Sequence, residues 1–406
     1  MTAVRDVLRR LGQGPPRRAE EDGQPAMPSL TGAAGEHIVI SSFDSPDNPH
    51  YHGGGAAVVD TIARLLGAHF EVTVVTAARG GGTVARDGVR YLRLPAGWAG
   101  PRGGQLLFHA LLPFAARRIR HDLWIESFTP PFSTSFLPLF SRAPVVGLAQ
   151  NLSGEEMWRR YRLPFFLVER FGLRFYRHVV VLNPADRARV AIRNPAADVR
   201  VIPNGMDVPE VDDAVLEHRE HVLFLGRIDI REKGLDLLLS AYERSGLGMP
   251  LLIAGAGTRR EERKLAALLA ATGGDVRWLG HVTGQRKREL LQRSAFVVLP
   301  SRYESFGLAA LEGMACGKPV VHFDLPSLRW MDGDVRVPAF DVSALAAQLA
   351  ELAGHEEARL DLGRAAWAAA QRYRQDVTAD RYLELVRQLL NAPGTGTQRE
   401  RDLACQ

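Results

Sequence analysis

The stretch that decides the fold is HVLFLGRIDIREKGLDLLLSAYERSGLGMPLLIAGAG, residues 221–257. It begins with an apolar run typical of a buried strand. Apolar residues then recur at helical spacing from Gly234 to about Ser245, and a second apolar run ends in glycines. A strand, a helix and a strand in this order form a unit whose two strands lie parallel in one sheet. The stretch therefore predicts an α/β domain.

The same alternation continues on both sides of this unit. Apolar runs with few polar residues are typical of parallel strands that are covered on both faces. Downstream strands are predicted in DVRWLG (275–280), FVVLP (296–300) and PVVHFD (319–324). Upstream strands are predicted in HIVISSF (37–43), FEVTVVTA (70–77), DLWIESF (122–128), PVVGLAQ (144–150) and HVVVLN (178–183). The pattern predicts two doubly wound, Rossmann-like parallel-sheet domains, which bind ligands at the carboxyl ends of their strands.

A break in the pattern sets the domain boundaries. Prolines, turn residues and charge interrupt the pattern over 203–220, and residues 206–220 are predicted to be a linker. We expect an N-terminal domain over 34–205 and a C-terminal domain over 221–373. The ends, residues 1–33 and 392–406, are predicted to be mobile tails.

Composition narrows the class of protein. The 406 residues suffice for two domains of about 150–200 residues each. Apolar residues make up 46% and charged residues 24%, which is typical of a globular chain and excludes a disordered one. Two cysteines, Cys316 and Cys405, are too few for a disulfide framework or a zinc cluster, so we expect a reducing cytoplasm. No apolar segment has the length of a membrane span or the form of a secretory signal.

Two segments of the second domain favour a phosphate-bearing ligand. In GRIDIREKG (226–234), Arg227 and Lys233 follow a predicted strand, where two cations can face a diphosphate. The alternative is a solvated charged turn. In ESFGLAALEGMACGKPVV (304–321), a helix is predicted to begin near Phe306 or Gly307, and its free N–H groups suit an anion.

Two carboxylates lie in the second segment. Glu304 falls in the loop and is expected to face a sugar. Glu312 lies about two turns further on, where it could accept hydrogen bonds from ribose hydroxyls. Two unrelated glutamates near a helix end are the alternative, and the surrounding string disfavours it.

A third segment, HGGGAAVV (52–59), lies between the first strand and the first helix. Gly53, Gly54 and Gly55 would let the backbone approach a ligand closely. The segment lacks the G-x-G-x-x-G spacing of a dinucleotide fingerprint.

Together and in this order, these segments resemble the retaining nucleotide-sugar glycosyltransferases of family 4, which have the GT-B fold. The most specific match is E-x₇-E, Glu304 to Glu312, supported by G-R-x₅-K-G, VIPNGMD (201–207) and LGHVTGQRKRELLQRSAFVVLPS (279–301). The resemblance runs from about residue 36 to 391. It implies two domains facing each other across a cleft, with a helix at 374–391 that returns to the N-terminal, acceptor-binding domain.

The resemblance also implies roles for individual residues. Arg227 and Lys233 would bind the donor diphosphate, and Glu304 would contact the transferred sugar; these three are the predicted catalytic residues. The predicted donor-binding residues are Gly53, Gly54, Gly55, Val282, Phe306, Gly307, Leu308 and Glu312. Many relatives carry a histidine near the sugar, where this chain has Gln150 and Asn151. A neutral amide can contact a sugar or acceptor hydroxyl but cannot act as an acid.

The resemblance implies an enzyme that moves a hexose-type sugar from a UDP- or GDP-sugar to an acceptor hydroxyl, with retention of configuration. Arg227 and Lys233 can stabilise the leaving diphosphate without a metal ion, so we expect neither a metal ion nor another cofactor. Two alternatives stay open: a non-catalytic nucleotide-sugar-binding protein and a sugar-nucleotide epimerase of the same architecture.

The sequence of the N-terminal half, where the acceptor is expected to bind, says less about the identity of that acceptor. The expected acceptor is a glycan, a lipid-linked molecule or a small molecule. Residues 157–178 combine six arginines with seven aromatic residues, and 103–122 are similar in character. They could touch an anionic membrane at its inner face, or their arginine stems could cover a core; we favour the second interpretation. No motif supports binding of nucleic acid.

Overall fold

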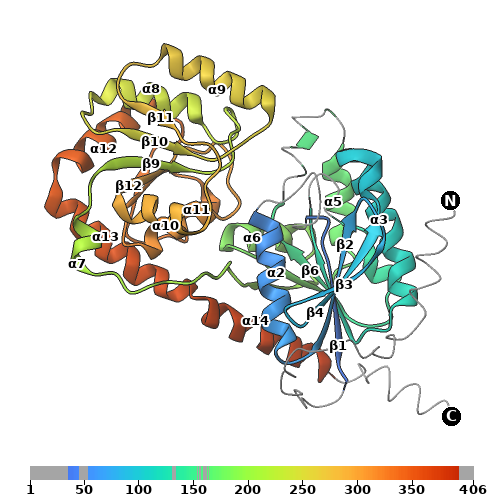
Figure 1. Cartoon of the computed structure of the whole chain (residues 1–406). Coiled ribbons are helices and arrows are strands. Elements are labelled where there is room, and N and C mark those ends of the chain that lie inside the picture. Colours follow the sequence, from blue (N-terminus) through green and yellow to red (C-terminus); the bar gives the residue numbers. More distant parts are fainter. Residues whose placement is uncertain are drawn as a thin grey trace, which may run out of the picture. The chain divides into compact units, whose positions relative to one another are not determined.

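The computed structural model describes residues 35–44, 54–129, 134–152, 154, 157, 158, 162 and 164–392. The chain divides into two compact units (Figure 1). The first unit takes residues up to Leu182, then Asp186–Ile202, and the chain from Ala379 onward. The second takes Asn183–Ala185 and Pro203–Thr378. Of the predicted tails 1–33 and 392–406, all residues except Ala392 lie outside the described residues.

The first unit contains an eight-stranded sheet with the strand order β3-β4-β2-β1-β5-β6-β7-β8. All neighbouring strands pair in parallel except β3 and β4, which form an antiparallel hairpin. The strands are β1 (His37–Ser41), β2 (Glu71–Ala78), β3 (Gly82–Arg86), β4 (Val89–Pro95), β5 (Leu123–Ser127), β6 (Val145–Ala149), β7 (His178–Val181) and β8 (Asp198–Val201). The helices are α2 (Gly54–Gly67), α3 (Gly100–Arg118), α5 (Phe165–Leu173) and α6 (Pro184–Arg193).

The second unit contains a six-stranded sheet, entirely parallel, with the order β11-β10-β9-β12-β13-β14. The strands are β9 (His221–Leu225), β10 (Leu251–Ala254), β11 (Val276–Trp278), β12 (Ser294–Leu299), β13 (Val320–Phe323) and β14 (Asp334–Val337). The helices are α7 (Asp213–Glu217), α8 (Leu235–Ser245), α9 (Arg259–Ala271), α10 (Gly284–Arg293), α11 (Leu308–Ala315), α12 (Val342–Gly354) and α13 (Glu356–Ala370). The predicted fold class, with two parallel α/β sheets, is confirmed.

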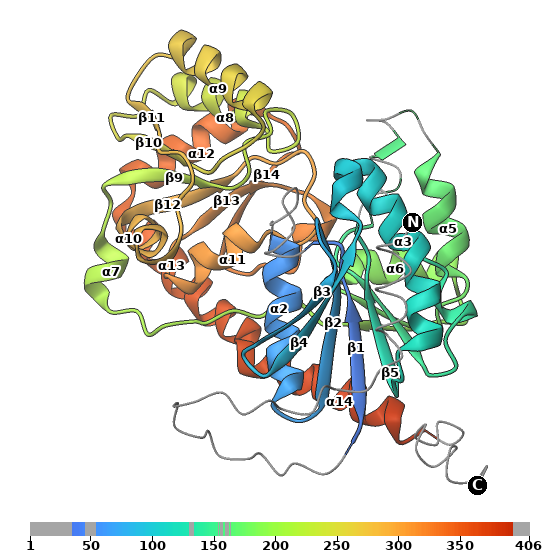
Figure 2. The ribbon, with the colours of Figure 1, turned by 45° about the vertical axis from the view of Figure 1, so that its right-hand side comes forward.

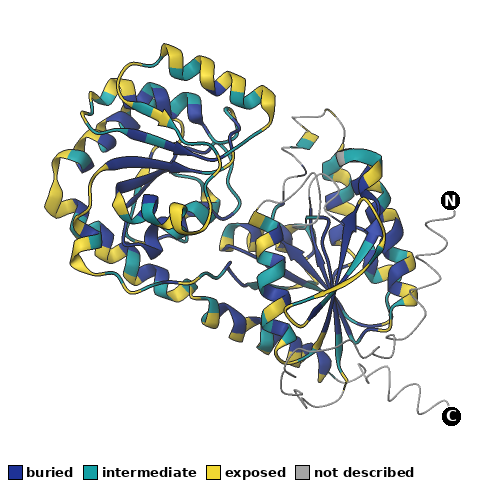
Figure 3. Cartoon of the chain, viewed as in Figure 1, coloured by how far each residue is buried: buried dark blue, intermediate teal, exposed yellow. Residues whose placement is uncertain are grey.

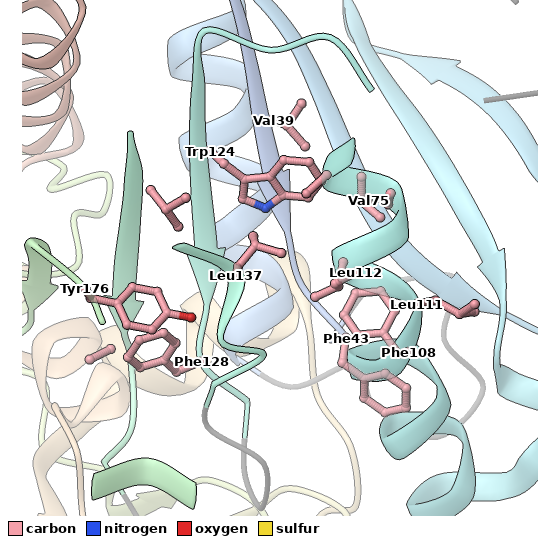
Figure 4. Close-up of a cluster of buried hydrophobic side chains, with 14 of the residues drawn as sticks. Val39, Phe43, Val75, Phe108, Leu111, Leu112, Trp124, Phe128, Leu137 and Tyr176 are labelled. Carbon is pink, nitrogen blue, oxygen red and sulfur yellow. The ribbon is translucent and has the colours of Figure 1, made fainter. Parts of the chain in front are cut away.

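Each sheet is buried by helices on its two faces (Figure 3). In the first unit, one face packs Phe108 and Leu112 of α3 against Trp124, Phe128 and other buried side chains (Figure 4). The opposite face packs α2 and the last helix, α14 (Gln375–Leu390), against β1, β2 and β5. In the second unit, α8 and α12 cover one face of the sheet.

Helix α14 belongs to both units. Its first turn lies in the second unit, and from Ala379 it lies in the first. The side chains that it contributes to the core of the first unit are Tyr382, Leu385, Val386, Leu389 and Leu390. The helix therefore completes a core that begins near residue 37.

The segment predicted to be a linker, 206–220, carries structure of its own. It contains α7, which Asp212 caps by accepting a hydrogen bond from the Val215 amide at 2.9 Å. The buried Lys318 ammonium donates to the carbonyl oxygens of Val215 and His218 at the end of this helix. The segment therefore packs on the second unit, and burial lowers the pKa of Lys318 to about 8.

Candidate functional site

The candidate site lies at the carboxyl ends of two neighbouring strands, β9 and β12 (Figure 1). The loop 226–234 follows β9, and the loop 300–307 follows β12. Gly234 has φ of 65°, and a Cβ atom there would lie 1.9 Å from the Pro300 carbonyl oxygen. The Arg302 amide also donates to the Glu232 carbonyl at 2.9 Å. The two loops are therefore packed backbone to backbone.

This packing brings Lys233 and Glu304 together. The Lys233 Nζ lies 2.5 Å from the Glu304 Oε2, and the Ser301 hydroxyl donates to the same oxygen at 3.0 Å. Only 15% of the Lys233 side chain and 12% of the Glu304 side chain are exposed. A partly buried ion pair with a supporting hydroxyl holds both charged groups in defined positions. The predicted cation and the predicted sugar-facing carboxylate thus share one site.

Arg227 lies on the same loop and is more exposed. Its guanidinium contacts Glu232 Oε1 at 2.5 Å and Asp229 Oδ2 at 3.2 Å, and 52% of its side chain is exposed. A guanidinium has five N–H donors, so it can turn toward a phosphate while retaining a carboxylate partner. Asp229 and Glu232 were not predicted as site residues, although they lie between the two predicted cations in the sequence.

The start of α11 supplies hydrogen-bond donors. Gly307 has φ of 85° and directly precedes the helix, which begins at Leu308. In the described chain, the amides of Phe306, Gly307 and Leu308 donate no hydrogen bond to another protein group. Free amides at the positive end of a helix form a site for an anion. Because Glu304 lies three residues before Gly307, this site adjoins the Lys233–Glu304 pair.

Glu312 lies further along α11 and has a cationic partner. Its Oε1 lies 2.8 Å from Nζ of Lys287, a residue of α10. Val282 lies in the loop that precedes α10. The structure therefore places the predicted ribose-binding carboxylate beside the helix that follows Val282. Lys287 was not predicted, because its sequence position gives no sign that it contacts Glu312.

Four of the predicted residues of the first unit lie near the carboxyl ends of β1 and β6. A Cβ atom on Gly55, in the first turn of α2, would lie 3.0 Å from Asp44 Oδ2 and 3.3 Å from Gln150 Oε1. Gln150 directly follows β6 and donates to the Ser127 hydroxyl at 3.3 Å. Gly54 starts α2, and Asn151 follows Gln150 in the chain. Gly53 lies outside the described residues.

A buried carboxyl group of the first unit was also missed. Glu126 in β5 accepts hydrogen bonds from the Tyr176 hydroxyl and from the Ser135 amide, the latter at 2.8 Å. Burial raises the pKa of Glu126 to about 7. These bonds tie the chain after β5 to the sheet. An acidic residue inside a predicted buried strand was the signal that could have revealed it.

Two family profiles match the chain. The profile described as Glycosyltransferase Family 4 matches residues 52–210, and the profile described as Glycosyl transferases group 1 matches residues 219–355. The chain belongs to glycosyltransferase family 4.

Curated proteins similar to this family 4 chain act on different molecules. The phosphatidyl-myo-inositol mannosyltransferase of Mycolicibacterium smegmatis is 35% identical over 193 residues, which are 44% of this chain and 49% of that protein. The glycogen synthase of Mycobacterium tuberculosis is 33% identical over 195 residues, 45% of each chain. The family 4 chain thus spans about half the length of the curated relatives that it matches.

Solved structures show the GT-B fold. Sucrose-phosphate synthase from Thermosynechococcus elongatus superposes with a TM-score of 0.74 at 21% identity, covering 87% of this chain and 99% of that one. Anabaena HepE, solved in complex with UDP and glucose, has a TM-score of 0.67 at 17% identity with the same coverage. At these identities the likeness shows the fold alone.

The residues that the structure describes contain neither a membrane-spanning helix nor a cluster of metal ligands. No helix among the residues that the structure describes is long and apolar enough to cross a bilayer. Within the same ranges, no three or more His, Cys, Asp or Glu side chains are grouped as metal ligands.

Proposed function

We propose that the protein transfers a hexose-type sugar from a nucleoside-diphosphate sugar to an acceptor hydroxyl, with retention of configuration and without a metal ion. The observation that carries the proposal is the Lys233–Glu304 pair, 2.5 Å between charged atoms, beside the free amides at the start of α11. A UDP- or GDP-sugar is the proposed donor. The UDP bound by HepE supports a UDP-sugar as the donor. Membership of family 4 supports transfer with retention of configuration.

The charges at this site suit the departure of a nucleoside diphosphate. As the bond between sugar and phosphate breaks, negative charge grows on the phosphate and positive charge grows at the anomeric carbon. In this proposal the negative charge is stabilised by Lys233, Arg227 and the α11 amides, and the positive charge is stabilised by Glu304. Preorganised groups of this kind commonly contribute most of the rate enhancement. Arg227 and Lys233 would exchange their carboxylate contacts for phosphate oxygens when the donor binds.

Donor binding and turnover in EDTA test this proposal. We expect one family of UDP-, GDP-, dTDP- or ADP-sugars to raise the thermal midpoint, because a ligand at 100 times its Kd stabilises the fold by about 2.7 kcal/mol. Transfer to an acceptor should continue at an unchanged rate in EDTA. No shift with any donor, with or without Mg²⁺, would contradict donor binding. Conversion of the donor in the absence of any acceptor would favour an epimerase, and loss of transfer in EDTA would contradict metal independence.

For the acceptor, we propose a lipid-linked molecule at an anionic membrane surface. Helices α3 and α5 lie on the same side of the first sheet (Figures 1 and 2). Both expose large apolar side chains next to arginines. The exposed apolar residues are Leu106, Phe114, Leu167, Phe171 and Phe175, and the exposed arginines are Arg117, Arg118, Arg170 and Arg174. Apolar side chains among cations bind an anionic lipid surface.

Vesicle binding tests the membrane proposal. The Phe171→Ser/Phe175→Ser variant should bind anionic phosphatidylglycerol vesicles at least about tenfold more weakly, because burial of a phenylalanine contributes about 1.5–3 kcal/mol. The matched control is Ile192→Ser, which removes an 81% exposed apolar side chain from α6. Equal binding by all three proteins, or equal binding to neutral and anionic vesicles, would contradict the proposal.

A further inference from the structure

The segment that follows β13 donates hydrogen bonds to carbonyl groups of the loop that precedes α11. The Ser327 hydroxyl donates to the Glu304 carbonyl at 2.6 Å. The Trp330 indole N–H donates to the Phe306 carbonyl at 2.9 Å. Neither side chain uses an amide of the loop. The segment therefore binds the side of the loop that faces away from the proposed anion.

Aromatic packing fixes Trp330 in place. Its ring stacks on that of Phe306 with centroids 4.5 Å apart and planes 7° from parallel, and Phe306 is only 1% exposed. The Tyr373 ring meets Trp330 at 4.6 Å, and its hydroxyl donates to the Trp330 carbonyl at 3.2 Å. Three rings and two hydrogen bonds thus define the direction of the indole N–H.

The bond to the Phe306 carbonyl also determines where an amide points. The carbonyl of one residue and the N–H of the next share a rigid plane and point in opposite directions. The Phe306 carbonyl therefore sets the direction of the Gly307 N–H, one of the free amides at the start of α11. Gly307 has no side chain to prevent this peptide from turning over, so an external bond is needed to hold it.

We propose that Trp330 is a positioning residue that holds the Gly307 amide toward the diphosphate of the donor. Ser327 does the same for the amide that follows Glu304. The inference rests on the proposed function, since it takes the anion at α11 to be the donor diphosphate. Trp330 acts through the backbone of the loop and does not touch the donor.

Binding of a nucleoside diphosphate and of the monophosphate with the same base separates this role from general support of the fold. Trp330→Phe keeps a ring for stacking and removes the N–H donor. It should weaken diphosphate binding about tenfold, because one hydrogen bond to a charged group is worth this much or more, and leave monophosphate binding unchanged. Trp367→Phe is the matched control, since that indole donates to the Pro209 carbonyl at 2.9 Å.

Each outcome decides the inference. Wild-type diphosphate affinity in Trp330→Phe, or an equal loss of both ligands, would overturn it while leaving the proposed function intact. Failure of the wild-type protein to bind any nucleoside diphosphate would overturn both. If Trp330→Phe does not fold, Ser327→Ala decides in its place, with a smaller loss for the diphosphate alone expected.

Discussion

Glu304→Gln should transfer sugar about 100 to 1,000 times more slowly than the wild-type protein and still bind the nucleoside diphosphate. The substitution keeps the size of the side chain and an oxygen that can accept from Ser301, which lies 3.0 Å away. It removes the negative charge proposed to stabilise the anomeric carbon. In the wild-type protein, Lys233 lies 2.5 Å from the Glu304 carboxylate. The substitution removes this ionic partner and leaves Lys233 free to contact phosphate. Diphosphate affinity should therefore be unchanged or higher while kcat falls.

The matched control for this variant is Asp236→Asn. Asp236 is also an ion-paired carboxylate, bound at 2.7 Å through both oxygens by Arg302, two residues before Glu304. Its removal should change kcat by less than about threefold, since its partner is Arg302 and 39% of its side chain is exposed. Steady-state kinetics and calorimetric binding of the diphosphate separate the two effects. An unchanged kcat in Glu304→Gln would exclude the catalytic role.

Gly234→Ala should lower the free energy of unfolding by more than about 4 kcal/mol, at the upper end of single substitutions. The new Cβ would meet the Pro300 carbonyl oxygen at 1.9 Å, so the two loops of the site would have to separate. A left-handed alanine adds about 1–2 kcal/mol. Most domains are stable by only about 5–15 kcal/mol, so this variant should lie close to unfolding.

Gly246→Ala isolates the effect of the close contact. Gly246 ends the same helix, α8, with φ of 64°, and a Cβ atom there would meet nothing within 4 Å. Gly246→Ala should therefore lower the free energy of unfolding only by the about 1–2 kcal/mol that a left-handed alanine costs. Urea unfolding of the three proteins gives both differences. Equal losses in the two variants would show that the Gly234–Pro300 approach is not tight in solution.

Most strands of both sheets were predictable because they are short apolar runs between turns. Strands β8 and β14 were missed because the short sequence DVRV of each alternates valine with a charged residue. The β3–β4 hairpin was missed because arginines interrupt the apolar residues of β4 and because β3 is largely exposed. A signal was present: Asp87 and Gly88, with φ of 50° and 76°, form the Asp-Gly turn typical of hairpins. The linker was predicted from proline and charge, and these do not reveal that Lys318 and Trp367 bind the segment.

The candidate site was predictable as a set of residue types and not as a set of contacts. Glu304, Lys233 and Arg227 stand in recognisable segments, and the structure brings the first two into direct contact. Lys287 contacts Glu312, and Trp330 contacts Phe306. Both contacts depend on which helices and loops lie next to each other in the fold. Nothing in the spacing of these residues along the chain encodes those distances.

The path of α14 has a genetic consequence. A stop codon anywhere between residues 203 and 378 falls in the second unit, yet it deletes the five side chains that complete the core of the first. The first unit is therefore not encoded by one continuous segment of the gene, and a fragment ending at residue 202 lacks part of its own interior. During synthesis the first unit must wait for the last helix to emerge before its core can close.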